Sequence, residues 1–533
     1  MKKNSFIVFL AVALILPVFS NAQKVSIKQN IMDAVKHMQL KEYPQAIVLL
    51  QQCYNQDSLN GNVNYLLGKS WYYADATLSK CIFYLKKAIP ISNTYSNANP
   101  KEKNAPPEAL YLLANACYHQ SFFEDAKTAC EQYLTYEPEN KAEIQKLLFY
   151  IGNAIPLVQN PLKINIVNLG CDINSSYDDH SPVFNIDETT MIFTSKRKGS
   201  TGNFKTSDGQ YFEDIYITHK VDGKWQVPEK ISKNINTMEH EASVALSSDG
   251  SELIIYKDDV GDGNLYISVY DGTEWSKPQK MSPNINSTYD ESHASISADG
   301  NILYFTSNRP GGYGGYDIYI SQRLPNGEWS LATNAGNIIN TSDDENGPFI
   351  HPDGTTLYFS SKGHNSMGGY DLFYSILKED GTFTKPDNMG YPINSIDNDA
   401  FYVISADGKR AYYATIQPGG CGGKDIYMVD LLSVPERSVV LITGFLRKTS
   451  TNEILKDIVL KIFDTDNKLI GTFRPNKNNG KYTLVLPKSK QNYILKPEDN
   501  TVVLENNHLE IPENSSFYLL QRPVEMETLG IVK

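Results

Sequence analysis

The 533-residue sequence predicts a multidomain protein that combines α-helical and all-β modules: a helical solenoid, a β-propeller and a β-sandwich. Three observations support this fold class. Helical periodicity without strand-like runs covers residues 28–155, one β-rich unit recurs along residues 161–431, and short strands separated by polar turns fill residues 438–520. The chain is also too long for a single hydrophobic core, so we expect several domains.

Residues 1–22 have the pattern of a secretory signal peptide. Two lysines are followed by an apolar run over residues 6–19 and by the small-residue sequence Ser20-Asn21-Ala22. A signal anchor is the alternative, but the apolar run is short for a membrane span. The sequence therefore predicts an exported protein whose mature chain has no transmembrane segment.

Composition excludes some partners. The formal net charge of -12 argues against binding to nucleic acids or anionic lipid surfaces, which require basic patches. Six cysteines in a chain of this length do not form a disulfide framework. Cys117 and Cys130 lie on neighbouring predicted helices, where they could form a bridge or serve as small core residues. No Cys/His cluster predicts a zinc site, and we expect no cofactor.

The helical region shows repeats. Ala114, Ala126 and Pro138 are spaced twelve residues apart, and Ala34 and Ala46 show the same spacing upstream. Small residues at this interval let the two helices of a pair approach each other, and the proline ends the second helix. The functional interpretation is a concave surface that binds a partner protein, and the alternative is a structural spacer.

Three markers recur in the β region, in five copies each. The D-G turn occurs at Asp249-Gly250, Asp299-Gly300, Asp353-Gly354 and Asp407-Gly408, with Asp187-Glu188 as the variant first copy. The strand with the sequence DIY or a variant of it begins at Asp214, Asn264, Asp317, Asp371 and Asp425. The sequence IN followed by Ser or Thr places its asparagine at Asn174, Asn236, Asn286, Asn340 and Asn394. Repeats of this length with several short strands predict propeller blades.

The order of the markers predicts how the ring closes. Trp225, Trp275, Trp329 and Phe383 mark an aromatic fourth strand in the first four units, and the fifth unit has none. A strand within residues 162–175 would complete the last blade and leave no open edge. Five blades are predicted, with six as the alternative if flanking sequence forms another blade.

The glycine-rich segment SNRPGGYGGYDIYIS, residues 307–321, is a hairpin and not a phosphate-binding loop. A phosphate-binding loop opens a helix, whereas this one lies between two strand patterns. Glycine here supplies the positive φ angles of a turn.

An acidic residue lies eight positions before each D-G turn, and all five copies keep the charge: Asp179, Glu241, Glu291, Glu345 and Asp399. One interpretation is an acidic ring at the channel mouth that holds a cation or a basic peptide end. The alternative is that each acid caps a turn or binds backbone groups of an adjacent blade. His180, His240 and His293 occupy related but not equivalent blade positions, and neither HExxH nor GxSxG occurs.

These patterns resemble known families. The form SADGNILYFTSNRPGGYGGYDIY resembles the PD40, or WD40-like, repeat of TolB-type propellers, the twelve-residue alanine spacing is similar to tetratricopeptide repeats, and residues 438–520 resemble a carboxypeptidase-regulatory-like (transthyretin-like) domain. This order of domains resembles PorE-type envelope proteins of Bacteroidota, which are associated with type IX secretion. The OmpA-like domain typical of that family is not found, so peptidoglycan binding is not expected.

The resemblance implies a non-catalytic periplasmic scaffold that contacts protein partners in the cell envelope near the outer membrane. The first alternative is a propeller that binds a glycan or a peptide, and the second is a propeller hydrolase or lyase. An enzyme would need a nucleophile, a base and an orienting group, and the sequence shows no such constellation.

Overall fold

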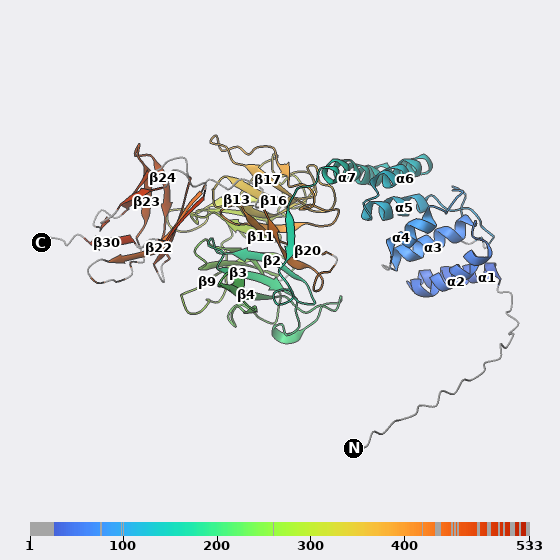
Figure 1. Ribbon diagram of the computed structural model, residues 1–533, viewed down its shortest axis with the longest axis horizontal. Helices are drawn as coiled ribbons and strands as arrows, with labels where there is room; N and C mark the ends of the chain where they lie inside the picture. Colours follow the sequence, from blue (N-terminus) through green and yellow to red (C-terminus); the bar gives the residue numbers. More distant parts are fainter. Residues whose placement is uncertain are drawn as a thin grey trace, which may run out of the picture. The chain divides into compact units, whose positions relative to one another are not determined.

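The computed structural model is shown in Figure 1. It describes residues 26–74, 77–96, 99, 101–258, 261–417, 419–431, 439–448, 451, 453, 455, 458–476, 480–487, 492–498, 502–504, 507–511, 517–521 and 524–528. The predicted signal segment, residues 1–22, lies outside the described residues. The chain divides into two compact units, Met1–Ile151 and Gly152–Lys533.

The first unit is helical, as the periodicity predicts. Its helices are α1 (Ile27–Gln39), α2 (Tyr43–Gln56), α3 (Gly61–Tyr73), α4 (Leu78–Leu85), α5 (Glu108–His119), α6 (Phe123–Tyr136) and the start of α7 (Lys141–Gln159). Successive helices pack in pairs, α1 on α2, α3 on α4 and α5 on α6. Among the described helices, none is both long and apolar enough to cross a membrane.

Small residues let the paired helices approach closely. The four alanines at the predicted twelve-residue spacing, Ala34, Ala46, Ala114 and Ala126, are completely buried. A Cβ atom added at Gly68 would lie 2.5 Å from the Leu85 side chain, so the contact between α3 and α4 requires glycine. The alanine spacing in the sequence thus reflects helix packing.

The cysteine pairing differs from the candidate bridge. Cys117 on α5 and Cys130 on α6 are free and buried as small core residues. The disulfide instead joins Cys171 to Cys421, which are 250 residues apart in the chain. The sequence left Cys117 and Cys130 open between a bridge and a core role, and the core role is the one observed. The bridged cysteines could not be paired from the sequence, because they come together only when the β ring closes.

The second unit contains five antiparallel sheets within residues 165–430. The first comprises β2 (Asp179–Phe184), β3 (Thr190–Ser195), β4 (Asp214–Val221), β5 (Lys224–Trp225) and β6 (Glu229–Lys230). The second comprises β7 (Glu241–Leu246), β8 (Glu252–Asp258), β9 (Gly263–Val269) and β10 (Gln279–Lys280). The third comprises β11 (Glu291–Ile296), β12 (Ile302–Ser307), β13 (Asp317–Gln322) and β14 (Thr333–Asn334). The fourth comprises β15 (Glu345–Ile350), β16 (Thr356–Ser361), β17 (Asp371–Ile376) and β18 (Asp387–Asn388). The fifth comprises β19 (Ala400–Ile404), β20 (Arg410–Thr415), β21 (Asp425–Asp430) and β1 (Asn165–Asn168).

The first strands of these sheets form a closed ring. β2 contacts β7, β7 contacts β11, β11 contacts β15, β15 contacts β19, and β19 returns to β2. This is the arrangement of a β-propeller around a central channel. We call β2, β7, β11, β15 and β19 the inner strands.

The strand register defines two faces of the ring. In the first sheet Asp179 lies opposite Ser195, and Ser195 lies opposite Asp214, so these three residues share one end of the sheet. The glycine-rich loops and the IN-S/T connections are at this end, which we call the mouth face. The D-G turns and the turns after the third strands are at the opposite end.

The fifth sheet is completed by a strand from the N-terminal start of the β region. β1 pairs antiparallel with β21, with Asn165 opposite Asp430 and Asn168 opposite Tyr427. This is the pairing that the marker order predicts. The predicted aromatic fourth strands differ in detail, because Trp275, Trp329 and Phe383 form isolated bridges in the turn that precedes each two-residue fourth strand.

The C-terminal segment forms two further sheets. One contains β22 (Val439–Lys448), β25 (Lys481–Pro487), β27 (Val502–Leu504), β29 (Phe517–Gln521) and β30 (Val524–Thr528), and the other contains β23 (Leu460–Asp464), β24 (Leu469–Phe473), β26 (Asn492–Pro497) and β28 (His508–Glu510). Both sheets contribute to one apolar core, which includes Ile442, Leu484, Ile462 and Tyr493.

Candidate functional site

The five repeated acids lie at the start of the inner strands and are buried. Their exposed fractions are at most 1%, and none of the cavities along the channel is lined by any of them: Asp179, Glu241, Glu291, Glu345 and Asp399. They therefore do not present their carboxylates at the channel mouth, and the predicted acidic binding ring is wrong in this respect.

Each acid instead binds the connection that leads into its own strand. The backbone N–H of the Ser or Thr in each IN-S/T sequence donates to the acid four residues later. The N···O distance is 2.7 Å from Ser287 to Glu291 and 2.7 Å from Thr341 to Glu345. This is the turn-capping role that the sequence left as the alternative.

The asparagine of the same sequence binds the previous sheet. Asn340 Oδ1 accepts from the backbone N–H of Ile318 at 2.8 Å, and its Nδ2 donates to the Ile318 carbonyl at 2.9 Å. The same pair of bonds occurs at all five connections, from Asn174, Asn236, Asn286, Asn340 and Asn394. The IN-S/T sequence and its acid thus join each sheet to the next one.

The five acids divide into two electrostatic classes. Arg197 pairs with Asp179 at 2.7 Å, Lys257 with Glu241 at 3.0 Å and Arg309 with Glu291 at 3.0 Å. In the described structure Glu345 and Asp399 have no such cation, so burial raises the pKa of each to about 7. These two carboxyl groups therefore keep their protons at pH values well above those at which a carboxylic acid usually ionises.

The channel is lined by the third residue of each inner-strand repeat, two positions after the acid. Here every inner strand has a β-bulge or register shift, and the channel-lining residues are Ser181, Ser243, His293, Gly347 and Phe401. Ser181 and Phe401 adopt positive φ angles of 51° and 62°. A positive φ is costly for an aromatic residue, and such positions cluster at functional sites.

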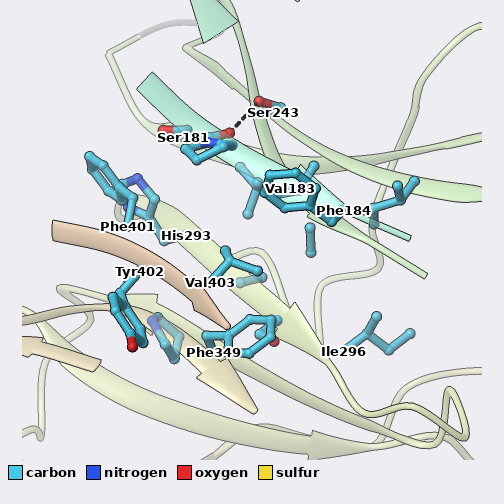
Figure 2. A pocket seen from close by; sticks show the side chains of 18 residues that line it. Ser181, Val183, Phe184, Ser243, His293, Ile296, Phe349, Phe401, Tyr402 and Val403 are labelled. Carbon is cyan, nitrogen blue, oxygen red and sulfur yellow. Dashed lines mark hydrogen bonds between the residues drawn. The ribbon is translucent and has the colours of Figure 1, made fainter. Parts of the chain in front are cut away.

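Phe401 closes the upper part of the channel. Its ring stacks on His293, with centroids 4.5 Å apart, and His180 lies on it at 6.4 Å. Figure 2 shows Phe401 beside His293 at one end of the cavity, with Ser243 donating a hydrogen bond to the Ser181 carbonyl at 2.9 Å. Burial and the nearby His180 lower the pKa of His293 to about 4, so its imidazole is neutral at neutral pH.

Below this stack the channel is narrow and apolar. Val183, Ile296, Phe349 and Val403 line a cavity with about 60 Å³ of free space (Figure 2). This space is too small for a ligand of ordinary size, so we place the candidate site above the stack.

The candidate site is a cavity of about 330 Å³ at the mouth face. It is lined by Asp178, His180, Ser181, Lys196, Glu213, Ala242, Tyr256, Ser292, His293, Phe401 and Lys424. These residues come from the inner strands, from the strand ends beside them and from the residues that precede the third strands. Its volume is at the lower end of the range for small-ligand pockets, about 300–1,000 Å³.

Glu213 organises one wall of this cavity. Its carboxylate lies 3.4 Å from His180 Nε2, 3.6 Å from His240 Nδ1 and 3.6 Å from Lys196 Nζ. Burial opposes the charge, but the two histidines and the lysine outweigh it and hold the pKa of Glu213 well below its usual range. The same contact raises the pKa of His240. The wall is therefore a charged and internally paired network.

Two of the three histidines that the sequence singled out contact the same carboxylate, and the third contacts one of them indirectly through an aromatic ring. His180 and His240 share Glu213, and His293 joins them through Phe401. The sequence analysis did not single out Glu213, Lys196 or Phe401. A signal was present, because the residue type at each of these positions varies among the repeats while the neighbouring markers stay constant. Among the described residues, no group of three His, Cys, Asp or Glu side chains could hold a metal ion.

Neither a protein-family model nor a curated protein sequence matches the chain significantly. TolB from Acinetobacter baumannii is similar in structure at 17% identity and a TM-score of 0.30, over 49% of this chain and 56% of that one. Putative TolB from Agrobacterium tumefaciens is similar at 14% identity and a TM-score of 0.31, over 61% and 97% of the two chains.

A glycoside hydrolase is also similar. The β-xylosidase RS223 has 12% identity and a TM-score of 0.35, over 57% of this chain and 97% of that one. The chain covers just over half the length of the Acinetobacter TolB. At such identities and TM-scores, these similarities do not bear on activity or partners.

Proposed function

We propose that the protein is a non-catalytic interaction protein of the bacterial cell envelope, of the PorE type, which binds a protein partner through the mouth face of its propeller. In this proposal the five sheets are the five blades of a TolB-type ring, the helical unit is a tetratricopeptide solenoid, and the C-terminal sheets are a transthyretin-like sandwich. Association with the type IX secretion machinery is part of the same proposal.

The observation that carries the proposal is the exposed apolar surface around the mouth cavity. Phe204, Met238, Tyr289, Tyr313 and Ile416 all lie in loops of the mouth face, and each is between 45% and 65% exposed. Aromatic residues and methionine are enriched where proteins bind each other. Rigid sheets hold these loops, as expected of a preformed binding surface.

Export is supported by the disulfide. Cys171–Cys421 needs an oxidising compartment, which the periplasm provides and the cytoplasm does not. Absence of catalysis is supported by the wall of the cavity, where the Glu213 carboxylate is engaged by His180, His240 and Lys196. To act as a general base, Glu213 would need a carboxylate oxygen free to accept a proton from a bound substrate.

A propeller that binds a glycan is the second candidate. Tyr256 and Phe401 line the cavity and would offer aromatic contacts to a sugar ring. The rings of His293 and His180 lie against Phe401, however, so its faces are largely used within the protein. The protein-binding function is therefore the better supported of the two.

The test is affinity purification of the tagged full-length protein from gently solubilised native envelopes, with mass spectrometry of the co-purifying proteins. We expect a stoichiometric envelope partner that is lost in the double variant M238S/Y289S. The matched control is V221S/L324S, which removes two exposed apolar residues from the opposite face.

Three results would contradict the proposal. Equal retention of the partner by both double variants would show that the mouth face is not part of the interface. A protein that purifies alone but binds defined oligosaccharides on a glycan array would favour the second candidate. A partner lost only when residues 28–155 are deleted would place the contact on the helical unit instead.

A further inference from the structure

Two lysines that line the mouth cavity have N–H donors that the protein does not use. The Lys196 ammonium lies 3.6 Å from Glu213 and 3.9 Å from Asp178, and both distances are longer than a hydrogen bond. The Lys424 ammonium has neither an ion pair nor a hydrogen bond within the described part of the chain. A lysine side chain carries three N–H donors and no acceptor. The cavity therefore contains cationic donors that lack acceptors.

The two carboxylates that line the same cavity are already bonded. Asp178 Oδ1 accepts from the backbone N–H of Lys424 at 2.9 Å, and its Oδ2 accepts from Gln210 Nε2 at 2.8 Å. Two histidines contact the Glu213 carboxylate, at 3.4 and 3.6 Å. The two lysines and the two acids balance in charge, so hydrogen bonding decides which group the cavity can take. A carboxylate would satisfy the free N–H donors, whereas an amine would have to compete with the existing bonds.

The rest of the mouth face carries charges of both signs. Glu239, Asp258 and Asp397 are exposed there, and so are Lys198 and Lys205. At physiological ionic strength, exposed charges more than about 8 Å apart are largely screened from each other. The groups inside the cavity, and not the net charge of the chain, therefore determine the charge of its ligand.

The cavity has a closed base. The stacked rings of Phe401 and His293, with centroids 4.5 Å apart, separate it from the lower channel, where about 60 Å³ of space is free. A polypeptide segment therefore cannot pass through the channel. A cavity of about 330 Å³ is also too small for a loop that enters and returns, but it can hold the last residues of an extended chain. The shape of the cavity thus favours a chain end.

Tyr256 adds aromatic surface to the cavity wall. At the same repeat position the other sheets have smaller residues: Thr194, Thr306, Ser360 and Ala414. A Cβ atom added at Gly263 would lie 2.3 Å from the Tyr256 ring, so glycine makes room for the tyrosine. Tyr256 and Phe401 both line the cavity, where they can contact an apolar side chain next to a bound carboxylate.

We propose that the mouth cavity binds the C-terminal carboxylate of the partner protein, with Lys196 and Lys424 as hydrogen-bond donors and an apolar last side chain against Tyr256. The proposal rests on the proposed function and specifies which part of the partner enters the propeller. The exposed apolar residues around the cavity then contact the segment that precedes the chain end. A free acidic sugar offers the same carboxylate chemistry and is the alternative that the test must separate.

The test selects peptides from a phage library that displays random sequences with a free C-terminus, with the full-length protein as bait. The selected peptides are then synthesised as free acids and as C-terminal amides, and their dissociation constants are measured by fluorescence anisotropy. We expect each free acid to bind about ten-fold more tightly than its amide, because the amide lacks the charge. A library that yields no binder, or acids and amides that bind equally, would overturn the proposal.

The cavity variant is K196Q/K424Q, in which we expect the difference between acid and amide to disappear. The matched control K198Q/K205Q removes the same charge from the same face, outside the cavity, and should stay within about two-fold of the wild type. Equal weakening in both double variants would show attraction by overall charge and would overturn the proposal.

The single variant K424Q keeps the test valid if K196Q/K424Q does not fold. Its ammonium has no partner to lose within the described residues, so the thermal unfolding midpoint should not change. We expect it to weaken binding of the free acids about three-fold and to leave the amides unaffected. Binding of glucuronate in calorimetry, without any selected peptide, would assign the cavity to an acidic sugar and overturn the proposal.

The two proposals can fail separately. An envelope partner that is retained by K196Q/K424Q but lost in M238S/Y289S would leave the proposed function intact and show that no chain end is bound in the cavity. A partner that is lost in neither variant would contradict both proposals.

Discussion

Glu291 and Glu345 occupy the same position in two successive repeats and differ in one neighbour. Both are buried, and both accept hydrogen bonds from the Ser or Thr that precedes them by four residues. Arg309 pairs with Glu291, whereas burial without a cation raises the pKa of Glu345 to about 7. One repeated sequence position therefore holds an ion-paired glutamate in one sheet and a glutamate with a raised pKa in the next.

This difference predicts opposite effects of the same substitution. An unfolded glutamate loses its proton near pH 4, and folded Glu345 keeps it to about pH 7. The folded state therefore binds more protons in this window, and its stability falls as the pH rises. We expect E345Q to gain on the order of 2 kcal/mol relative to the wild type between pH 5 and pH 8. Urea unfolding at several pH values measures this change.

The matched substitution is E291Q. It leaves the Arg309 guanidinium beside a neutral amide in a largely buried site, so we expect it to cost about 3 kcal/mol at both ends of the pH range. A difference between E345Q and the wild type that does not depend on pH would contradict the raised pKa of Glu345.

The sequence identified the five acids that recur in every repeat, but it could not decide between a binding role and a structural role for them. Charge was constant at five positions, which fits either a binding ring or a structural contact. The decisive facts are burial and the Ser/Thr partner four residues away, and the repeat made that partner visible in advance. Glu213 and Lys196 could not be predicted to share a site with Phe401, because the first two belong to the first repeat and Phe401 to the fifth, and the cavity that they line forms only when the ring closes.

At the scale of elements, the glycine-rich loop of the third sheet bonds to the strand that follows it and packs closely against the next connection. Tyr313 and Gly314 donate their backbone N–H groups to Asp317, at 2.6 and 3.0 Å. A Cβ atom added at Gly314 would lie 1.8 Å from the Asp343 carbonyl oxygen, whereas Gly311 has open space and a φ of 93°. The two glycines are therefore required for different reasons.

This distinction predicts different costs for alanine. G311A imposes only the left-handed backbone penalty, about 1 kcal/mol. G314A forces apart the hairpin and the connection to the fourth sheet, and we expect a cost of about 3 kcal/mol. Denaturant midpoints of the two variants decide the matter. A G314A protein as stable as G311A would mean that the two segments can separate freely.

The sequence predicted the hairpin character of this loop correctly, since strand patterns flank it. It did not predict the close contact with Asp343, because that residue belongs to the next repeat. Local turn chemistry was therefore predictable, and the packing between repeats was not.

At the scale of the whole β ring, closure depends on one short strand and one disulfide. β1 pairs with β21, and Cys171, just after β1, is bonded to Cys421 in the last glycine-rich loop. The bond closes a loop of 250 residues, so it removes much of the conformational freedom of the unfolded chain. The covalent link and the strand pairing act at the same junction.

We expect C171S/C421S to fold but to lose up to about 5 kcal/mol of stability. Reductant should lower the unfolding midpoint of the wild type towards that of the variant and leave the variant unchanged. The four other cysteines, Cys53, Cys81, Cys117 and Cys130, are free, so they give reductant nothing further to break. An equal response of both proteins to reductant would contradict this role of the bond.

Each inner strand separates two tasks that lie only two residues apart. The buried acid begins the strand or, in the fifth sheet, directly precedes it, and the residue two positions later lines the channel. His293 and Phe401 contact each other through their rings, whereas Ser243 bonds the Ser181 carbonyl of the neighbouring sheet and so takes part in the joint. A library that varies His293 and Phe401 on an unchanged ring would be a rational route to new binding specificities.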